Sequence, residues 1–150
     1  MKSIISKTMA LLVICATAFS FAPKPGGEGF EISLNNKVIV QKYGNEMNKV
    51  QTLQLNSASA SDKLSIKYYH CGRIGKNRVI TLKDMDNNII KEIHFPDVNN
   101  PVATMTLNVK DILSLKKGIT TLKLFYSSSE LPSGRMLVSI NSGGSNSTMP

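Results

Sequence analysis

The feature that most restricts the fold of this chain is a series of short runs in which apolar and polar residues alternate. In residues 63–70, KLSIKYYH, every second position from Leu64 to Tyr68 is apolar. Successive side chains of a β-strand point to opposite faces of a sheet, so each run predicts a strand with one face in the core. The runs that show this pattern, or one close to it, are 30–34, 37–42, 50–55, 63–70, 78–84, 89–95, 102–109, 120–126 and 135–140. The chain is therefore expected to consist mainly of strands.

Turn-forming residues separate these runs. Asn35 and Asn36 stand between the first two runs, and because Asn tolerates a positive φ they predict a hairpin with a primed two-residue turn. Strand-sized runs separated by turns at intervals of about 8–12 residues are typical of sandwiches and barrels. We therefore predict an all-β fold, a single antiparallel β-sandwich of jelly-roll or immunoglobulin-like topology.

One segment departs from the alternation. In residues 109–118, VKDILSLKKG, three apolar residues form a short face and Gly118 is suited to a left-handed helix cap. We therefore expect one short helical connection between two strands, at Asp111 to Leu115.

The same segment carries a resemblance to a known group of domains. Residues 106–126, which contain LNVKDILSLKKGITTLKLFY, resemble the closing segment of galactose-binding-like jelly-roll domains: a strand, a short Asp-initiated helical turn, a Lys-Gly corner and an alternating strand. Here Thr120 stands where that segment usually has an asparagine, and the chain has no tryptophan. The resemblance implies the fold class and carries over no binding residue. The whole chain is also similar to small exported proteins of Bacteroidetes type, which implies export and no particular chemistry.

The N-terminus predicts export. Two lysines precede an apolar stretch at residues 9–16, and small residues follow as far as Ala22, which is the pattern of a signal peptide. The apolar run is shorter than the about 20 residues that span a bilayer. We therefore expect residues 1–22 to be removed and the protein to be secreted or periplasmic. Contact with a membrane is expected only through this peptide, unless Cys15 is lipidated, and the bulky residues before Cys15 argue against a lipobox.

The remaining chain suits one domain. Residues 23–29, PKPGGEG, have no hydrophobic pattern and predict a flexible lead-in. Residues 30–141 are expected to form the β-sandwich domain. Residues 142–150 are rich in Ser, Gly and Asn and predict a disordered tail.

The charge of the chain restricts its partners. Its 18 Lys and Arg outnumber its 10 Asp and Glu, which gives a formal net charge of +8. The cations are scattered and no nucleic-acid-binding motif is present, so nucleic acid is not expected as a partner. A glycan or an envelope protein stays open as the partner.

The most distinctive stretch for a site is residues 68–78, YYHCGRIGKNR. Its two glycines and its cations Arg73, Lys76 and Arg78 predict a weak anion-binding nest. A phosphate-binding P-loop is excluded because no Ser or Thr follows Lys76. The alternative is an ordinary connection between two strands, in which glycines turn the chain and the cations face water.

His70 and Cys71 stand side by side in this stretch. Neighbouring residues on a strand point to opposite faces, so His70 is expected to be partly buried and the two are not expected to share a metal. With His94 as the only other histidine, no metal site and no cofactor are predicted. We interpret Cys71 as a structural cysteine that behaves as a small buried hydrophobe. The alternatives are a Cys-dependent enzyme built on Cys71, His70 and Arg73, and an intermolecular disulfide between copies.

Residues 84–88, DMDNN, imitate the start of a calcium loop. The sixth position is Ile89 instead of Gly and the twelfth is Phe95 instead of Glu, so the pattern fails where it sets geometry and charge. We expect a hairpin turn that uses Asp and Asn for local hydrogen bonds.

Two aromatic residues are expected to point outward. Tyr69 and Phe125 alternate with residues assigned to the core, and they predict a ligand or partner surface. The alternative is that both faces of their strands are covered. Because no catalytic constellation is found, the sequence favours a non-catalytic exported protein, a binding or structural module of the cell envelope or extracellular space. A carbohydrate-binding accessory domain for acidic glycans is the alternative.

Overall fold

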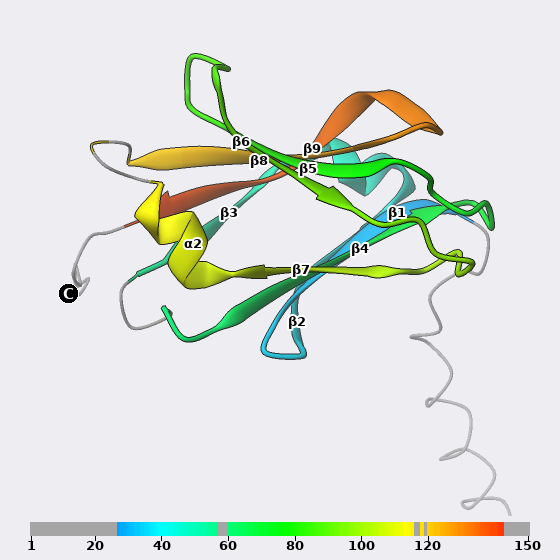
Figure 1. Ribbon diagram of the computed structural model, residues 1–150, viewed down its shortest axis with the longest axis horizontal. Coiled ribbons are helices and arrows are strands. Elements are labelled where there is room, and N and C mark those ends of the chain that lie inside the picture. Colours follow the sequence, from blue (N-terminus) through cyan, green and yellow to red (C-terminus); the bar gives the residue numbers. More distant parts are fainter. Residues whose placement is uncertain (1–26, 57–59, 116–117, 119, 143–150) are drawn as a thin grey trace, which may run out of the picture.

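The computed structural model describes residues 27–56, 60–115, 118 and 120–142, and it shows an all-β sandwich of two facing sheets (Figure 1). In chain order the elements are β1 (Glu28–Leu34), β2 (Lys37–Tyr43), the 3-10 helix η1 (Gly44–Asn48), β3 (Gln51–Leu55), β4 (Lys63–His70), β5 (Arg78–Lys83), β6 (Ile89–Phe95), β7 (Thr104–Asn108), α2 (Val109–Ser114), β8 (Thr121–Ser128) and β9 (Leu131–Ser142). The predicted signal peptide and residues 143–150 of the predicted tail lie outside the described residues.

The strand order differs between the two sheets. The first has four strands in the order β2-β1-β4-β7, all antiparallel. The second has five in the order β3-β9-β8-β5-β6, and here β3 pairs with β9 in parallel. The predicted sandwich is confirmed, and this one pair departs from a purely antiparallel arrangement. The departure arises because the chain crosses from the first sheet to the second between β2 and β3, and it enters the new sheet in the direction of β9.

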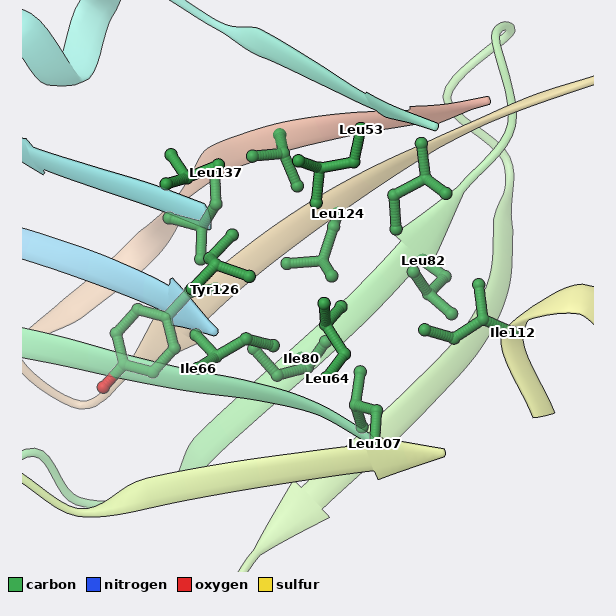
Figure 2. Close-up of a cluster of buried hydrophobic side chains, with 14 of the residues drawn as sticks. Leu53, Leu64, Ile66, Ile80, Leu82, Leu107, Ile112, Leu124, Tyr126 and Leu137 are labelled. Atoms are coloured by element: carbon green, nitrogen blue, oxygen red, sulfur yellow. The ribbon is translucent and has the colours of Figure 1, made fainter. Parts of the chain in front are cut away.

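The core lies between the sheets and follows the predicted alternation. In β4, Leu64, Ile66 and Tyr68 are buried while the residues between them are partly exposed. In β8 of the opposite sheet, Leu122, Leu124 and Tyr126 are likewise buried, and the residues between them are partly exposed. Figure 2 shows the side chains of both sheets interlocking. Each fully buried Leu or Ile contributes about 1.5–3 kcal/mol through the hydrophobic effect, so the alternation determines which face of each strand points inward.

The first hairpin turn is the one that the sequence predicts. Asn35 and Asn36 have φ values of 48° and 68°, as a primed turn requires. The Asn35 side chain also accepts a hydrogen bond from the backbone N–H of Lys63 at 2.9 Å and donates one to Asp62 at 2.7 Å. The turn is thereby attached to the start of β4.

Several predicted boundaries are wrong by a few residues. Helix α2 begins at Val109 instead of Asp111, because the backbone is extended as far as Asn108, the N-cap residue. Strand β1 begins at Glu28, within the segment predicted as a flexible lead-in. Residues 127–134, which separate the last two predicted runs, are largely strand, since Gly134, with a φ of 69°, allows a bulge and pairing continues from Leu131.

Candidate functional site

The histidine of the YYHCGRIGKNR stretch lies in a closed polar cluster at one end of the core. His70 Nε2 is 2.8 Å from the Tyr126 hydroxyl and 3.3 Å from Ser128 Oγ. Tyr68 stacks on Tyr126 with ring centroids 4.3 Å apart. We name Tyr68, His70, Tyr126 and Ser128 the closed cluster. These side chains and their neighbours leave no internal volume that could hold a water molecule.

Burial controls the ionisation of this cluster. It is the main cause that lowers the pKa of His70, since it disfavours the charged imidazolium, and the carboxylates of Glu130 and Glu28 oppose it. Burial likewise raises the pKa of Tyr68, whose hydroxyl donates a hydrogen bond to Glu28 at 2.5 Å. His70 is therefore a neutral core group that serves packing and hydrogen bonding.

Glycine is required at two positions of the stretch for different structural reasons. Gly72 has a φ of 84° and turns the chain after β4. Gly75 is needed for space, because a Cβ there would lie 2.9 Å from the Tyr126 hydroxyl and 3.0 Å from His70 Nε2. Both glycines are thus explained by the connection between β4 and β5, without a bound anion.

The structure separates the three cations predicted to bind an anion. Arg73 and Lys76 are exposed, but Arg78 is buried at 5% exposure. The Arg78 guanidinium donates to the carbonyl oxygen of Pro96 at 2.7 Å and to that of Ala103 at 3.4 Å. The expectation that these cations face water together is wrong for Arg78. Because Arg78 shares a strand face with Ile80 and Leu82, the alternation itself was the signal that it points inward.

A carboxylate of the chain already occupies part of the predicted nest. The backbone N–H of Lys76 donates to Glu130 Oε2 at 2.9 Å. A backbone amide that satisfies an internal carboxylate is not available to an external anion. The Lys76 backbone amide therefore does not contribute to anion binding at this place.

Cys71 is exposed, so the interpretation of it as a buried structural cysteine is wrong. Strand β4 ends at His70, and Cys71 takes a left-handed turn conformation with a φ of 53°. The turn is closed by the backbone N–H of Arg73, which donates to the His70 carbonyl at 3.1 Å. His70 directs Nε2 to Tyr126 in the core, so the pair does not form the nucleophile-and-base contact that a cysteine enzyme needs.

The calcium-like loop is occupied by an ammonium group of the chain. Lys123 Nζ donates to the Met85 carbonyl and to Asn87 Oδ1, each at 2.9 Å. The Asp84 carboxylate accepts from the side chain and backbone of Asn88 and from the backbone of Asp86, and the side-chain bond is the main one of the interactions that lower its pKa. In the described part of the chain, no group of three or more His, Cys, Asp or Glu residues could hold a metal ion.

The two aromatic residues predicted as one surface lie on opposite sides of the molecule. Tyr69 is on the outer face of the four-stranded sheet, and Phe125 is on the outer face of the five-stranded sheet. Phe125 lies beneath the Lys83 ammonium, 4.7 Å from its ring centroid. A single platform made of both rings is therefore excluded.

Tyr69 has a different aromatic partner. In the first sheet, Gly29 of β1 pairs with Tyr43 of β2 on one side and with Tyr69 of β4 on the other. The two tyrosine rings are 5.7 Å apart at a tilt of 46°, and a Cβ on Gly29 would overlap the Tyr43 ring. The missing side chain lets the rings meet across the middle strand. Sequence reasoning missed this pair because it depends on which strands become neighbours.

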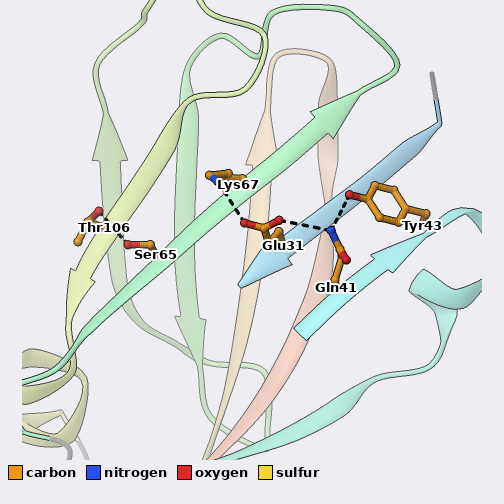
Figure 3. Close-up of polar contacts among 6 residues, drawn as sticks. All are labelled: Glu31, Gln41, Tyr43, Ser65, Lys67 and Thr106. Carbon is orange, nitrogen blue, oxygen red and sulfur yellow. Dashed lines mark hydrogen bonds and ion pairs between the residues drawn. The ribbon is translucent and has the colours of Figure 1, made fainter. Parts of the chain in front are cut away.

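A polar network runs beside the Tyr43 ring (Figure 3). Glu31 accepts from Lys67 Nζ at 3.1 Å and from Gln41 Nε2 at 3.4 Å, and Gln41 Nε2 also donates to the Tyr43 hydroxyl at 3.0 Å. Burial, with smaller effects of Glu31 and Tyr43, raises the pKa of Tyr69 to about 12. We name Glu31, Gln41, Tyr43, Lys67 and Tyr69 the tyrosine face.

A groove of about 380 Å³ lies elsewhere, at the side of the sandwich where β6 and β7 are the outermost described strands. Its floor is apolar, with Leu82, Leu107 and Ile112, and its rim includes Lys91 and Asp111. Its volume is within the range of small-ligand sites, about 300–1,000 Å³.

Together these features define a β-sandwich protein with a polar, aromatic sheet face. No model of a known protein family matches the chain, and no curated protein matches it significantly. None of the helices in the described residues is both long enough and apolar enough to cross a membrane.

Proposed function

We propose that this protein is an exported, non-catalytic binding module of the cell envelope or extracellular space, and that it binds through the tyrosine face. The observation that carries this proposal is the Tyr43–Gly29–Tyr69 row, which places two half-buried rings beside a hydrogen-bonded polar network on one sheet face. Aromatic rings with a polar handle supply contact area at a low entropic cost, which makes them frequent anchors of binding surfaces.

The chemistry of the described residues supports a binding role over a catalytic one. His70, with a lowered pKa, is enclosed in the closed cluster. Cys71 is exposed and has no base in contact with it in the described residues. Neither group meets the geometric requirement for acid-base or nucleophilic catalysis. Export is supported by the signal-peptide pattern of residues 1–22.

Two measurements test this proposal. Mass spectrometry of the protein from fractionated cells should find a mature N-terminus near Ala22 in the secreted or periplasmic fraction. Purified cell envelopes and secreted polymer should retain the labelled mature protein, and Tyr69→Ala should weaken retention by about tenfold, as expected for an aromatic anchor. Phe125→Ala, on the opposite face, is the matched control.

Equal retention of the Tyr69→Ala and Phe125→Ala proteins would remove the tyrosine face as the binding surface. A full-length protein that stays in the cytoplasm with residues 1–22 intact would contradict the export part of the proposal.

A further inference from the structure

We infer that the ligand of the tyrosine face is a neutral sugar unit, and this inference rests on the proposed function. Three properties of the face support it: the inclination of its rings, the hydrogen-bonding groups that remain for a ligand, and the balance of its charges.

The rings favour a compact ligand with C–H surfaces. Tyr43 and Tyr69 are half-buried, with centroids 5.7 Å apart and planes inclined by 46°. Because the rings do not form one flat shelf, the pair fits a single saccharide unit or a chain end better than an extended flat surface. The C–H faces of a pyranose pack against aromatic rings, whose faces carry the negative part of the quadrupole.

The polar groups match hydroxyls, which both donate and accept. Gln41 makes both of its hydrogen bonds through Nε2, so the group that it offers to a ligand is the acceptor Oε1. The Tyr43 hydroxyl accepts from Gln41 and can donate outward. Within the described residues Lys67 donates to Glu31, and an ammonium has three N–H donors. Both donors and acceptors therefore remain available to a ligand on the tyrosine face.

The charges favour a neutral ligand over an acidic one. Glu31 and Lys67 form an ion pair at 3.1 Å, and their side chains are 12% and 37% exposed, so the positive charge that an anionic sugar needs is already neutralised. An added carboxylate or sulfate would also lie close to Glu31. The formal net charge of +8 is that of the whole chain, with Lys2 and Lys7 of the predicted signal peptide included, whereas the tyrosine face has one charged residue of each sign, Glu31 and Lys67.

The positions of the exposed apolar side chains favour a sugar over a protein as the partner of this face. The cores of protein interfaces are richer in apolar groups than the rest of the surface. The large apolar side chains that are exposed in the described residues are Val38, Val50, Met85, Ile89 and Val98, and only Val38 belongs to the four-stranded sheet. The five residues of the tyrosine face thus offer rings and hydrogen bonds without an aliphatic anchor, and Val38 lies opposite Ser33, nearer the turn between β1 and β2.

The experiment uses the mature chain, isotopically labelled, with two classes of probe: neutral hexoses and their oligosaccharides, and the acidic polymers polygalacturonate and heparin. We expect at least one neutral sugar to shift the amide resonances of β1, β2 and β4, with an affinity that changes little between about 50 and 500 mM salt. Tyr69→Ala and Gln41→Leu should each weaken binding by about tenfold. Tyr69→Phe, which keeps the ring, and Phe125→Ala should bind as the unaltered chain does.

Other outcomes overturn the inference. Binding of only the acidic polymers, with a steep salt dependence, would show that the ligand is anionic; if the shifts still map to the tyrosine face, the proposed function survives. Failure of every sugar to shift this face also overturns the inference, and the envelope-retention assay then decides separately whether the face binds something else. Neutral sugar binding that maps to the groove between β6 and β7 would overturn both.

Discussion

The last residues of β4 enter two different environments, and the comparison contrasts the buried core with the sheet face that we propose for binding. Tyr68 and His70 point inward, where the Tyr68 hydroxyl donates to Glu28 and His70 Nε2 bonds to the Tyr126 hydroxyl. Lys67 and Tyr69 point outward, where their contacts leave hydrogen-bonding capacity for a ligand. Similar residue types thus have opposite roles, because successive side chains of a strand lie on opposite faces of the sheet.

The largest expected difference between the two environments is in folding stability. Tyr68→Ala removes a ring that is 3% exposed and stacked on Tyr126, and we expect the free energy of unfolding to fall by about 3–5 kcal/mol. Tyr69→Ala on the outer face should cost about 1 kcal/mol or less. Urea denaturation of the two variants measures both. Equal losses would show that the inner and outer faces do not differ as described.

The packing of the closed cluster can be tested by adding one methyl group. Gly75→Ala places a Cβ within 3.0 Å of Tyr126 and His70, so we expect a loss of about 1–3 kcal/mol from overpacking. Gly27→Ala is the control, because a Cβ there meets nothing within 4 Å. Thermal unfolding followed by circular dichroism compares the two. A stability of Gly75→Ala within error of the control would contradict the close packing.

The lowered pKa of His70 predicts a loss of stability in acid. Above about pH 6.5 the imidazole is neutral in both the folded and the unfolded chain, so His70 does not make the free energy of unfolding depend on pH there. As the pH falls below that value, the unfolded chain binds a proton that the folded chain does not, so the free energy of unfolding decreases until the pH passes the folded pKa. His70→Gln should flatten this part of the stability profile, measured by urea denaturation across the range.

The pH profile has a matched control in the second histidine. His94 is exposed on β6, outside the closed cluster, so His94→Gln should keep the acid-dependent slope of the unaltered chain. Glu28 and Glu130 act on His70 in the direction opposite to burial, and Arg73 acts with it. A slope that disappears in the His94 variant and persists in the His70 variant would contradict the assignment.

The smallest expected effect concerns the ion pair of the tyrosine face. Glu31→Gln should change the free energy of unfolding by about 1 kcal/mol, since the pair lies at the protein surface with the Lys67 side chain 37% exposed, and Gln keeps an oxygen that can accept from Lys67. It should also lower the pKa of Tyr69 from about 12 towards the ordinary value, because it removes one of the charges that raise it, while burial, the larger cause, remains. Ultraviolet titration of Tyr69, resolved against a Tyr69→Phe protein, measures the shift. An unchanged pKa would mean that Glu31 does not act on this ring.

Local patterns predicted the parts of the fold that local forces control. The alternation identified Leu64, Ile66 and Tyr68 as core residues, and Asn35-Asn36 as the turn. The candidate site was predicted less well. Arg78 was assigned to an exposed nest because glycines and cations near it suggest a loop, whereas the strand already begins at Arg78 and carries it inward.

Cys71 shows a second limit of prediction from the sequence. Its residue type favours burial, but the end of β4 and the positive φ at Cys71 place it in an exposed turn. Where the last ladder bond of a strand forms depends on the partner strand, and here β1 pairs with β4 as far as Glu28 opposite His70. Composition and alternation do not contain that information.

By itself the sequence determined that the chain folds into strands, which faces of those strands are buried and where the first hairpin turns, because these depend on neighbours within a few residues. Only the tertiary structure decided that Tyr43 meets Tyr69 across Gly29 and that Phe125 lies on the opposite side. Those contacts depend on the pairing order of the strands, which the burial of both sheets together selects.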